Sequence, residues 1–241
     1  MSIVTEHRQV EIIKIVNTLG KAQVKELATY FHVSTETIRR DLQHLTREKK
    51  VEKIFGGAKR ISSQLIEPPI GTAGEEIKEL QAKRKIAEKA ASYIKENELI
   101  ILDEGTTTLQ MLPFLCRYRS LKIITNSFQI ANELMNLARN GKFKGKLIFI
   151  GGVVQLKHQR SLGLIAEKMI QEFYVDRAFL SADGYSEEYG ITGFDLEKVQ
   201  LTKLFLKQAK RNYFLLDKSK QEFRTNYHIC DYQDVDDIIS A

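Results

Sequence analysis

Residues 33–45, Val-Ser-Thr-Glu-Thr-Ile-Arg-Arg-Asp-Leu-Gln-His-Leu, place an apolar stripe and a row of cations on opposite sides of one helix. Ile38, Leu42 and Leu45 recur at the i, i+4, i+7 spacing of a helix that packs on a core. Ser34 precedes this helix, where a serine hydroxyl accepts a first-turn N–H. A short basic helix with one polar face fits the major groove of DNA. The segment therefore predicts a recognition helix.

The polar side of this helix supplies the predicted DNA contacts. Thr37, Arg40 and Gln43 are expected to read base edges, joined by Arg39, while the cations neutralise phosphates. The full set of helix residues expected to contact DNA is Ser34, Thr35, Thr37, Arg39, Arg40, Gln43, His44 and Arg47.

The flanking segments complete a winged helix-turn-helix. A first helix is expected over Glu6–Leu19, ending at Gly20, with an apolar side that faces the core and comprises Val10, Ile13, Val16 and Leu19, with Ile12 on the same broad side. A second helix is expected from Val24 to Phe31, and residues 32–33 form the turn before the recognition helix. Residues 51–61 alternate around Gly56-Gly57, which is typical of a β-hairpin. Its cations, expected to reach the sugar-phosphate backbone, are Lys53, Lys59 and Arg60.

The charge of the chain is concentrated in this first segment. Residues 1–60 hold 12 Lys and Arg against 7 Asp and Glu, whereas residues 61–241 hold 25 against 24. The net charges are +5 and +1, so the basic excess belongs to the predicted DNA-binding module. Charge alone would leave open a small helical domain that is basic by chance; the helix pattern favours DNA binding.

The chain beyond residue 60 predicts a second domain of the α/β class. Residues 61–74 include Pro68-Pro69 and are expected to be a linker between residues 1–60 and 75–241. A long helix is expected over residues 75–96. Apolar runs then alternate with helical segments, which predicts a mainly parallel sheet covered on both faces. The expected strands are 99–102, 121–125, 146–150, 178–182, 213–216 and 237–239, and the expected helices are 108–115, 128–139, 163–173 and 196–210.

The expected strands end in small, polar or charged residues, and ligands of such sheets bind beyond the carboxyl ends of the strands. Gly105 and the threonines after it precede a helix, as in a phosphate-binding loop. Each loop taken singly could equally be an ordinary capped turn; together they predict a pocket for a polar anion. The residues expected there are Asp103, Gly105, Thr106, Thr107, Thr108, Thr125, Asn126, Gly151, Gly152, Asp183, Gly184 and Lys220. Gln155, His158 and Arg160 are expected to shape the pocket, at positions that the pattern does not fix.

These motifs resemble those of the DeoR family of bacterial transcriptional regulators. The resemblance covers Thr-Ile-Arg-Arg-Asp-Leu at 37–42, Gly-Gly-Ala at 56–58 and the strand-end loops just named. Near the hairpin the family commonly has Gly, Arg and His where this chain has Lys50, Lys53 and Phe55. The resemblance implies a winged helix-turn-helix followed by a sensor domain similar in fold to ribose-5-phosphate isomerase, with a phosphorylated sugar or related intermediate as effector.

The isomerase resemblance also implies roles for single residues. Lys220 matches a lysine that meets substrate, Gly105–Thr108 match a phosphate loop, and Glu197-Lys198 resemble the run that holds the isomerase base. Leu180 and Gly184 stand where two carboxylates of the isomerase would be. Because those carboxylates position the substrate for proton transfer, their loss predicts binding without catalysis. Glu197 is therefore included among the expected effector contacts.

The predicted function is a DNA-binding regulator, a repressor of sugar or carbon metabolism genes, and not an enzyme. Its expected partners are double-stranded operator DNA, a phosphorylated sugar and further copies of itself as a dimer or tetramer, because one winged helix buries little DNA. Neither a cofactor nor a metal is expected, and Cys116 and Cys230 are too few and too far apart for a disulfide framework or a zinc site. The chain shows no signal peptide and no apolar window long enough to span a membrane, so a cytoplasmic protein is expected. The alternatives are a sugar-phosphate isomerase with an accessory DNA-binding head and an architectural DNA-binding protein without an effector.

Overall fold

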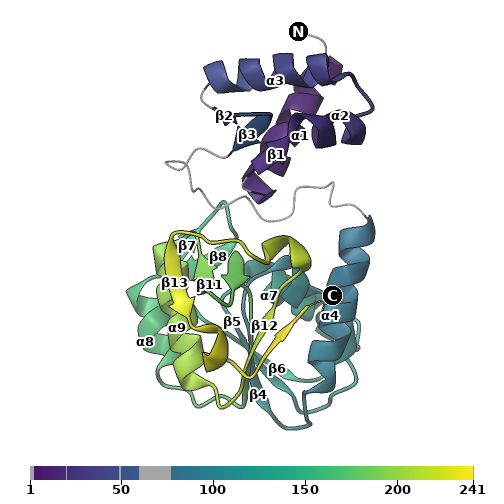
Figure 1. Cartoon of the computed structure of the whole chain (residues 1–241). Coiled ribbons are helices and arrows are strands. Elements are labelled where there is room, and N and C mark those ends of the chain that lie inside the picture. The colour runs from purple at the N-terminus through teal and green to yellow at the C-terminus, as the bar shows by residue number, and fades with distance from the viewer. Residues whose placement is uncertain (1–2, 20, 49, 60–76, 241) are drawn as a thin grey trace. The chain divides into compact units, whose positions relative to one another are not determined.

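The computed structural model describes residues 3–19, 21–48, 50–59 and 77–240 (Figure 1). The chain divides into two compact units, residues 1–66 and 67–241, each with a hydrophobic core of its own. Gly20, Arg60 and the predicted linker at 61–74 lie outside the described residues. Among the described residues, no helix combines the length and apolarity needed to cross a membrane.

The first unit is a winged helix-turn-helix, as predicted. Its helices are α1 (Ile3–Leu19), α2 (Val24–Tyr30) and α3 (Thr35–Arg47). Its antiparallel sheet has the order β1-β3-β2, with β1 (Lys21–Gln23), β2 (Glu52–Ile54) and β3 (Gly57–Lys59). The strands β2 and β3 form the predicted hairpin, and β1 was not predicted. Gly57 is required because a Cβ there would lie 2.2 Å from the carbonyl oxygen of Ala22 on the paired strand.

The core of this unit confirms the predicted inner face of α3 and corrects that of α1. Ile38 and its partners on the stripe are buried. In α1, however, Val10 is 62% exposed, whereas Ile12 and Val16 are fully buried. The expectation that Val10 faces the core is therefore wrong. The inner face instead passes through Gln9, whose side-chain amide hydrogen-bonds to α3 and so occupies the place expected for an apolar residue.

The second unit is built on a six-stranded sheet of order β14-β12-β9-β4-β5-β6, whose neighbouring strands all pair in parallel. The strands are β4 (Leu99–Leu102), β5 (Lys122–Thr125), β6 (Lys146–Phe149), β9 (Arg177–Leu180), β12 (Asn212–Leu215) and β14 (Asp237–Ile239). The α/β prediction is thus confirmed. The chain order runs outward from β4 to one edge and from β9 to the other, so it reverses between β4 and β9.

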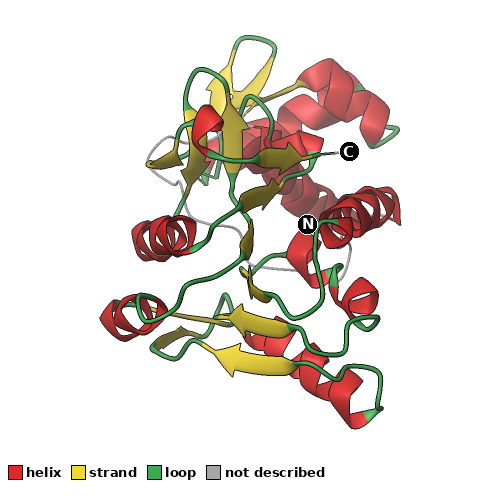
Figure 2. Cartoon of the chain, turned by 90° about the horizontal axis from the view of Figure 1, so that it is seen from below, coloured by secondary structure: helices red, strands yellow, loops and turns green. Residues whose placement is uncertain are grey.

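Helices cover both faces of this sheet, which Figure 2 shows as a layer of strands between helices. On β4, Ile100 and Leu102 join one core cluster and Ile101 joins the other, as the two-residue period of a strand requires. The helices packed on the first face are α4 (Ile77–Ser92), α6 (Leu112–Leu115) and α7 (Phe128–Arg139); those on the second are α8 (Leu164–Ile170) and α9 (Leu196–Gln208).

Several elements differ from the sequence prediction. The helix expected at 108–115 is two short helices, α5 (Thr106–Leu109) and α6, because Pro113 lacks an N–H and clashes with the preceding turn. The long helix expected at 75–96 is described only as α4. The antiparallel strands were not predicted: β7 (Val153–Gln155) with β8 (Arg160–Leu162), and β10 (Gly184–Ser186) with β11 (Gly190–Gly193) and β13 (Tyr227–Cys230). Two 3-10 turns, η1 (Lys218–Lys220) and η2 (Tyr232–Asp234), follow β12 and β13.

Candidate functional site

Helix α3 begins as predicted and points its basic side chains to solvent. The Ser34 hydroxyl accepts the backbone N–H of Thr37 at 3.1 Å and lies 2.9 Å from the Thr37 hydroxyl. The side chains of Arg39 and Arg40 are 65% and 80% exposed and contact only Glu36, at 3.5 and 3.9 Å, among the ion pairs of the described chain. Such exposed pairs contribute little stability, so both guanidinium groups are free to meet an external anion.

The rest of the predicted DNA-binding set on α3 is less uniform. Thr35, Gln43 and Arg47 are exposed, as a contact surface requires. His44 is only partly exposed, and its Nε2 lies 3.7 Å from Glu48. His44 thus sits at the margin of the surface rather than at its centre.

The structure gives Asp41 a role that sequence reasoning did not assign. Its carboxylate is buried and accepts the Nε–H of Arg8 at 2.6 Å and the side-chain amide of Gln9 at 2.9 Å. Both partners lie on α1, so Asp41 fixes the position of the recognition helix on the first helix. The signal was available, because Asp41 falls between Ile38 and Leu45 on the inward side of α3.

The hairpin carries the predicted cations and an exposed aromatic ring. Lys53 is exposed, and Lys59 is partly exposed with its Nζ 3.0 Å from Glu52. Phe55 lies in the turn next to Gly56 and is fully exposed. The third predicted cation of the hairpin, Arg60, lies outside the described residues.

In the second unit, the parallel sheet brings the predicted strand-end loops to one edge. The loop after β4 is adjacent to those after β5 and β9, and the order of chain connection reverses between β4 and β9. In open parallel sheets such a switch point is where ligands bind. The position of the predicted pocket is therefore defined by the topology, and its side chains can be placed around it.

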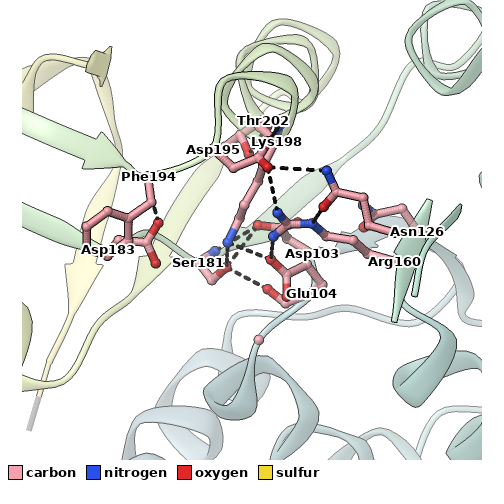
Figure 3. A network of polar contacts seen from close by, with 12 residues as sticks. Asp103, Glu104, Asn126, Arg160, Ser181, Asp183, Phe194, Asp195, Lys198 and Thr202 are labelled. Carbon is pink, nitrogen blue, oxygen red and sulfur yellow. Dashed lines mark hydrogen bonds and ion pairs between the residues drawn. The ribbon is translucent and has the colours of Figure 1, made fainter. Parts of the chain in front are cut away.

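A cluster of buried charges occupies the switch point (Figure 3). Glu104, the second residue after β4, accepts on one oxygen both the Arg160 Nη1 at 2.7 Å and the Lys198 Nζ at 2.6 Å. The Arg160 side chain is wholly buried, and it also lies 3.4 Å from Asp195 and donates its Nε–H to Gln155 at 2.9 Å. Arg160 comes from β8 and Lys198 from α9, so three separate elements meet at one carboxylate.

Ser181, at the end of β9, links this cluster to Asp103. Its backbone N–H and its hydroxyl both lie 3.1 Å from one oxygen of Asp103, and its hydroxyl lies 2.6 Å from the carbonyl oxygen of Glu104. The Lys198 Nζ lies 3.2 Å from the same hydroxyl. The loops after β4 and β9 are therefore joined by side chains across the switch point.

The cluster perturbs its own acids in opposite directions. Burial, reinforced by the charge of Glu104, raises the pKa of Asp103 to about 6. The positive charge of Lys198 opposes this rise, because it stabilises the ionised carboxylate. Burial also disfavours the charged form of Glu104, but the attraction of Lys198 and Arg160 outweighs it and lowers the pKa of Glu104 to about 2. In Asp195, N–H donation from Lys198 and from Gln155 outweighs burial and lowers the pKa. Perturbed acids of this kind concentrate at functional sites.

Several predicted pocket residues serve the local turns in this structure. The Thr108 hydroxyl donates to the carbonyl oxygens of Asp103 and Gly105 at 2.8 and 2.9 Å, and the Thr125 hydroxyl accepts the N–H of Ser127. Thr107 is buried and Thr106 is partly exposed. The hydroxyls of Thr108 and Thr125 thus already have intramolecular partners, as in the ordinary capped turns that the sequence left possible.

The predicted glycines are explained mainly by close backbone approaches. A Cβ at Gly152 would lie 2.4 Å from the carbonyl oxygen of Leu162, and one at Gly184 would lie 2.0 Å from that of Phe223. Gly151 instead faces open space, with no atom of the described chain within 4 Å of its Cβ position. Of these glycines, Gly151 alone leaves room beside the strand ends for a ligand.

The remaining predicted contacts lie around the cluster. Asp183 accepts the N–H of Phe194 at 3.0 Å, and the Lys220 Nζ donates to the carbonyl oxygen of Ala182 at 2.7 Å. Glu197 is exposed, with its carboxylate 3.4 Å from the amide nitrogen of Gln155. These three residues surround the switch point without joining the Glu104 ion pairs.

Asn126 is the predicted pocket residue with an unmet hydrogen-bonding group. It is fully buried, and its side-chain N–H₂ donates to the carbonyl oxygen of Ser161 at 3.1 Å. Its Oδ1 has no hydrogen-bond partner within the described part of the chain. The following residue, Ser127, forms a β-bridge with Arg160, so Asn126 lies beside the charged cluster (Figure 3).

A groove of about 1030 Å³ begins at the same edge of the sheet. Thr106, Phe128 and Gln159 line the end of the groove that borders the strand ends, and its remaining lining comes largely from α5, α6, α7 and β6. The groove is mainly apolar, so it offers space beside the polar cluster for the body of a ligand.

Sequence reasoning did not identify the core of this site. Glu104 and Ser181 were passed over, Lys198 was noted only through the isomerase resemblance, and Arg160 could not be placed. A signal existed for Glu104, because an acid two residues after a buried strand and just before Gly105 requires a cation nearby if it is buried. Nothing in the local sequence says which cation supplies it.

Comparison with known proteins agrees with both units. The family model described as the DeoR-like helix-turn-helix domain matches residues 8–64, and that of the DeoR C terminal sensor domain matches residues 78–241. The uncharacterised HTH-type transcriptional regulator YulB of Bacillus subtilis is 34% identical over 97% of this chain and 87% of its own length. IolR of the same organism is 32% identical over 83% and 77%. The putative aga operon transcriptional repressor of Escherichia coli O157:H7 is 29% identical over 98% and 86%.

Comparison with solved structures finds similarity at low identity and with TM-scores below 0.5. Ribose 5-phosphate isomerase A from Methanocaldococcus jannaschii is 22% identical, with a TM-score of 0.40, over 58% of this chain and 53% of that one. The translation initiation factor eIF-2B from Pyrococcus horikoshii OT3 is 13% identical, with a TM-score of 0.48, over 99% and 95%.

Proposed function

The chain belongs to the DeoR family of transcriptional regulators, and from that membership we propose that it is a repressor of sugar or carbon metabolism genes whose hold on DNA is released by a phosphorylated sugar. One relative is named for a sugar operon, the L-fucose operon activator of Haemophilus influenzae, which is 30% identical over 97% of this chain and 91% of its own length, and the putative aga operon relative is named as a repressor. Repression is the direction proposed for this chain.

The observation that carries DNA binding is the asymmetry of α3. Ile38, Leu42 and Leu45 are buried in the core of the first unit, while Arg39, Arg40 and Arg47 are exposed on the other side. We place the predicted α3 set and the hairpin cations on the DNA, with base reading by Arg40, Thr37 and Gln43. Residues 1–60 are proposed as the DNA-binding domain, 61–74 as a linker and 75–241 as the sensor domain.

DNA binding is tested by salt-dependent titration against duplexes that the full chain selects from a random pool. Arg40→Ala should weaken binding of the best duplex by about 1–3 kcal/mol if Arg40 contacts a base in a bidentate manner. Arg139→Ala removes the same charge from the last turn of α7 and should leave affinity unchanged. Equal affinities for the two variants would remove α3 from the DNA interface.

The effector is proposed to bind at the switch point between β4 and β9. The support is the convergence there of buried charges, an unpartnered Asn126 oxygen and a groove large enough for a small metabolite. A ligand that binds only the native protein raises its melting temperature. A thermal-shift screen of sugar phosphates, followed by release of the selected duplex, tests the proposal. An absence of any shift across the screen would favour the architectural DNA-binding alternative.

We further propose that the sensor domain is not an enzyme. The residue matched to the isomerase base, Glu197, is exposed and outside the charged cluster, and Leu180 and Gly184 supply no carboxylate. A base must lie within hydrogen-bonding reach of the proton that it removes, in a site that positions the substrate. Turnover of pentose or hexose phosphates that disappears in Glu197→Gln would revive the isomerase alternative.

The proposed regulator acts as a dimer or tetramer, because one winged helix covers little DNA and two heads bind more tightly when they are linked. Effector binding would favour one arrangement of the heads over another, by no more than its difference in affinity for the two. Mass measurement in solution, with and without the selected duplex, tests the oligomeric state. A monomer on a single half-site would contradict it.

A further inference from the structure

The charged cluster at the switch point lacks an obvious structural purpose. Removing charged groups from water is expensive, and replacing a buried ion pair by apolar residues is often neutral or stabilising. Here Arg160 and Lys198, both almost fully removed from solvent, converge on one oxygen of Glu104. Both cations come from elements that follow the β4 loop in sequence, Arg160 from a hairpin and Lys198 from a helix. Their meeting at the ligand-binding position of the sheet points to a role in binding.

The charge balance of the cluster decides what it can bind. Two cations, Arg160 and Lys198, face the carboxylates of Glu104, Asp195 and Asp103. With Glu104 in place the cluster carries no net positive charge, so an added phosphate would gain little from entering it. A phosphate can use the two cations only if the Glu104 carboxylate leaves them. Phosphate and carboxylate oxygens accept hydrogen bonds from arginine in the same geometry, so one can replace the other.

An independent observation marks the same place as a ligand site. The Asn126 side chain is fully buried beside Arg160, and its Oδ1 is without a hydrogen-bond partner in the described chain. A buried acceptor that stays unpaired costs free energy. A ligand that brings a hydroxyl next to its phosphate would satisfy this oxygen, and a phosphorylated sugar has both groups.

We propose that Glu104 is an internal occupant of the effector's anion site, and that the phosphate of the effector binds by displacing the Glu104 carboxylate from Arg160 and Lys198. The inference rests on the proposed function, since it concerns the regulation of the same site. Asn126 Oδ1 then accepts a hydroxyl of the sugar. Neutral sugars, which cannot replace a carboxylate, do not bind.

Displacement also gives the site a way to report its state. Glu104 is followed directly by Gly105 and by α5, whose Thr106 and Leu109 line the groove. The loop is held to β9 through the Ser181 hydroxyl, which lies 2.6 Å from the Glu104 carbonyl oxygen. Moving the Glu104 side chain therefore perturbs the loop and α5 together. An anion that merely added to the surface would leave this segment unchanged.

The experiment measures phosphate affinity by calorimetry on the full chain, with inorganic phosphate and ribose 5-phosphate as probes and ribose as the uncharged control. Glu104→Gln keeps the shape of the side chain and removes the competing charge, so both phosphate probes should bind at least about tenfold more tightly. Glu172→Gln removes the same charge from an exposed position after α8 and should change nothing. Adding Arg160→Gln to Glu104→Gln should abolish the gain.

The outcomes separate the two levels of the proposal. If the wild type binds the phosphate probes and Glu104→Gln binds them equally well or more weakly, displacement is overturned while the proposed function stays intact. Failure of every variant to bind a phosphorylated probe, with no release of DNA, would overturn both.

A second measurement keeps the test independent of how well Glu104→Gln folds. In the wild type, saturating inorganic phosphate should change amide hydrogen exchange in residues 104–109 by at least about threefold, because the loop must move when Glu104 leaves. Unchanged exchange in this segment at saturation would refute displacement.

Discussion

The buried Asp41 offers the sharpest test of how the recognition helix is positioned. Asp41→Ala removes an acceptor that binds Arg8 at 2.6 Å and Gln9 at 2.9 Å across the α1–α3 contact. The Arg8 side chain is only 13% exposed, so it would keep a charge with little water and without its carboxylate. Removing one partner of a buried pair typically costs about 3–5 kcal/mol. Because Arg8 retains some access to solvent, we expect about 2–3 kcal/mol here.

A pair on the outer side of the same helix provides the matched control. Glu36 meets Arg39 and Arg40 at 3.5 and 3.9 Å with all three side chains more than half exposed. Exposed pairs of this kind contribute less than about 0.5 kcal/mol. Glu36→Gln should therefore leave the free energy of opening of α3 nearly unchanged, although it alters a carboxylate–arginine contact just as Asp41→Ala does.

Hydrogen exchange read by mass spectrometry measures the opening of α3 directly. A loss of about 2–3 kcal/mol corresponds to amide exchange roughly 30- to 160-fold faster in this helix. DNA affinity should fall for every duplex sequence alike, because the change misplaces the whole helix rather than one base contact. Similar exchange rates in Asp41→Ala and Glu36→Gln would refute the anchoring role, and so would loss of affinity for only one duplex sequence.

Three further changes test the hairpin and the sensor domain. Phe55→Ala should lower DNA affinity by about 1 kcal/mol without moving the melting temperature, because the ring is fully exposed and protruding apolar side chains wedge into the minor groove; an unchanged affinity would show that the ring does not touch DNA. Lys220→Ala should leave binding of the selected duplex intact but remove its release by sugar phosphate, and a normal response would remove Lys220 from the site. Asp103 has a pKa raised from 3.8 to about 6, so the native state holds a proton that the unfolded chain has lost; stability should fall by up to about 3 kcal/mol as pH rises through that window. Denaturant titrations of wild type and Asp103→Asn between pH 4 and pH 7 should show this fall in the wild type only, and parallel curves would contradict it.

The fold could be predicted largely because its main elements are encoded locally. Strands buried on both faces appear as apolar runs, and β4 and β14 have the predicted bounds. The Ser34 cap and the apolar period of α3 likewise depend on neighbouring residues only. The antiparallel strands escaped because β7, β8, β10 and β11 are short, and because Val153 and Val154 on β7 are exposed rather than in a core. Local apolar pattern then gives no strand signal.

The position of the candidate site could be proposed from the sequence, but its charged core could not. The rule for parallel sheets picked out the edge at which the buried charged cluster lies, and Asp103, Asn126 and Asp183 do lie there. The partners of Glu104, however, come from positions 56 and 94 residues away, at Arg160 and Lys198. Such pairs form only when a hairpin and a helix fold back over the switch point, and no local period encodes that meeting. For the same reason Gln9 replaced Val10 on the inner face of α1, since its partner Asp41 is distant in sequence.

Two of the buried carboxylates, Asp41 and Glu104, illustrate different uses of the same costly interaction. Asp41 has partners on one neighbouring helix, and its charge is balanced by Arg8. It fixes one geometry, and no second anion could enter without breaking the fold of the first unit. Glu104 instead shares two cations with further carboxylates around the ligand position of a parallel sheet, next to an acceptor that lacks a donor. There the internal ion pairs can be exchanged for an external anion, so that much of the cost of burying charge is already met before the effector arrives. Preformed cations of this kind would let a small phosphorylated molecule compete with a covalently attached carboxylate, and the strength of that competition would set the effector concentration at which DNA is released.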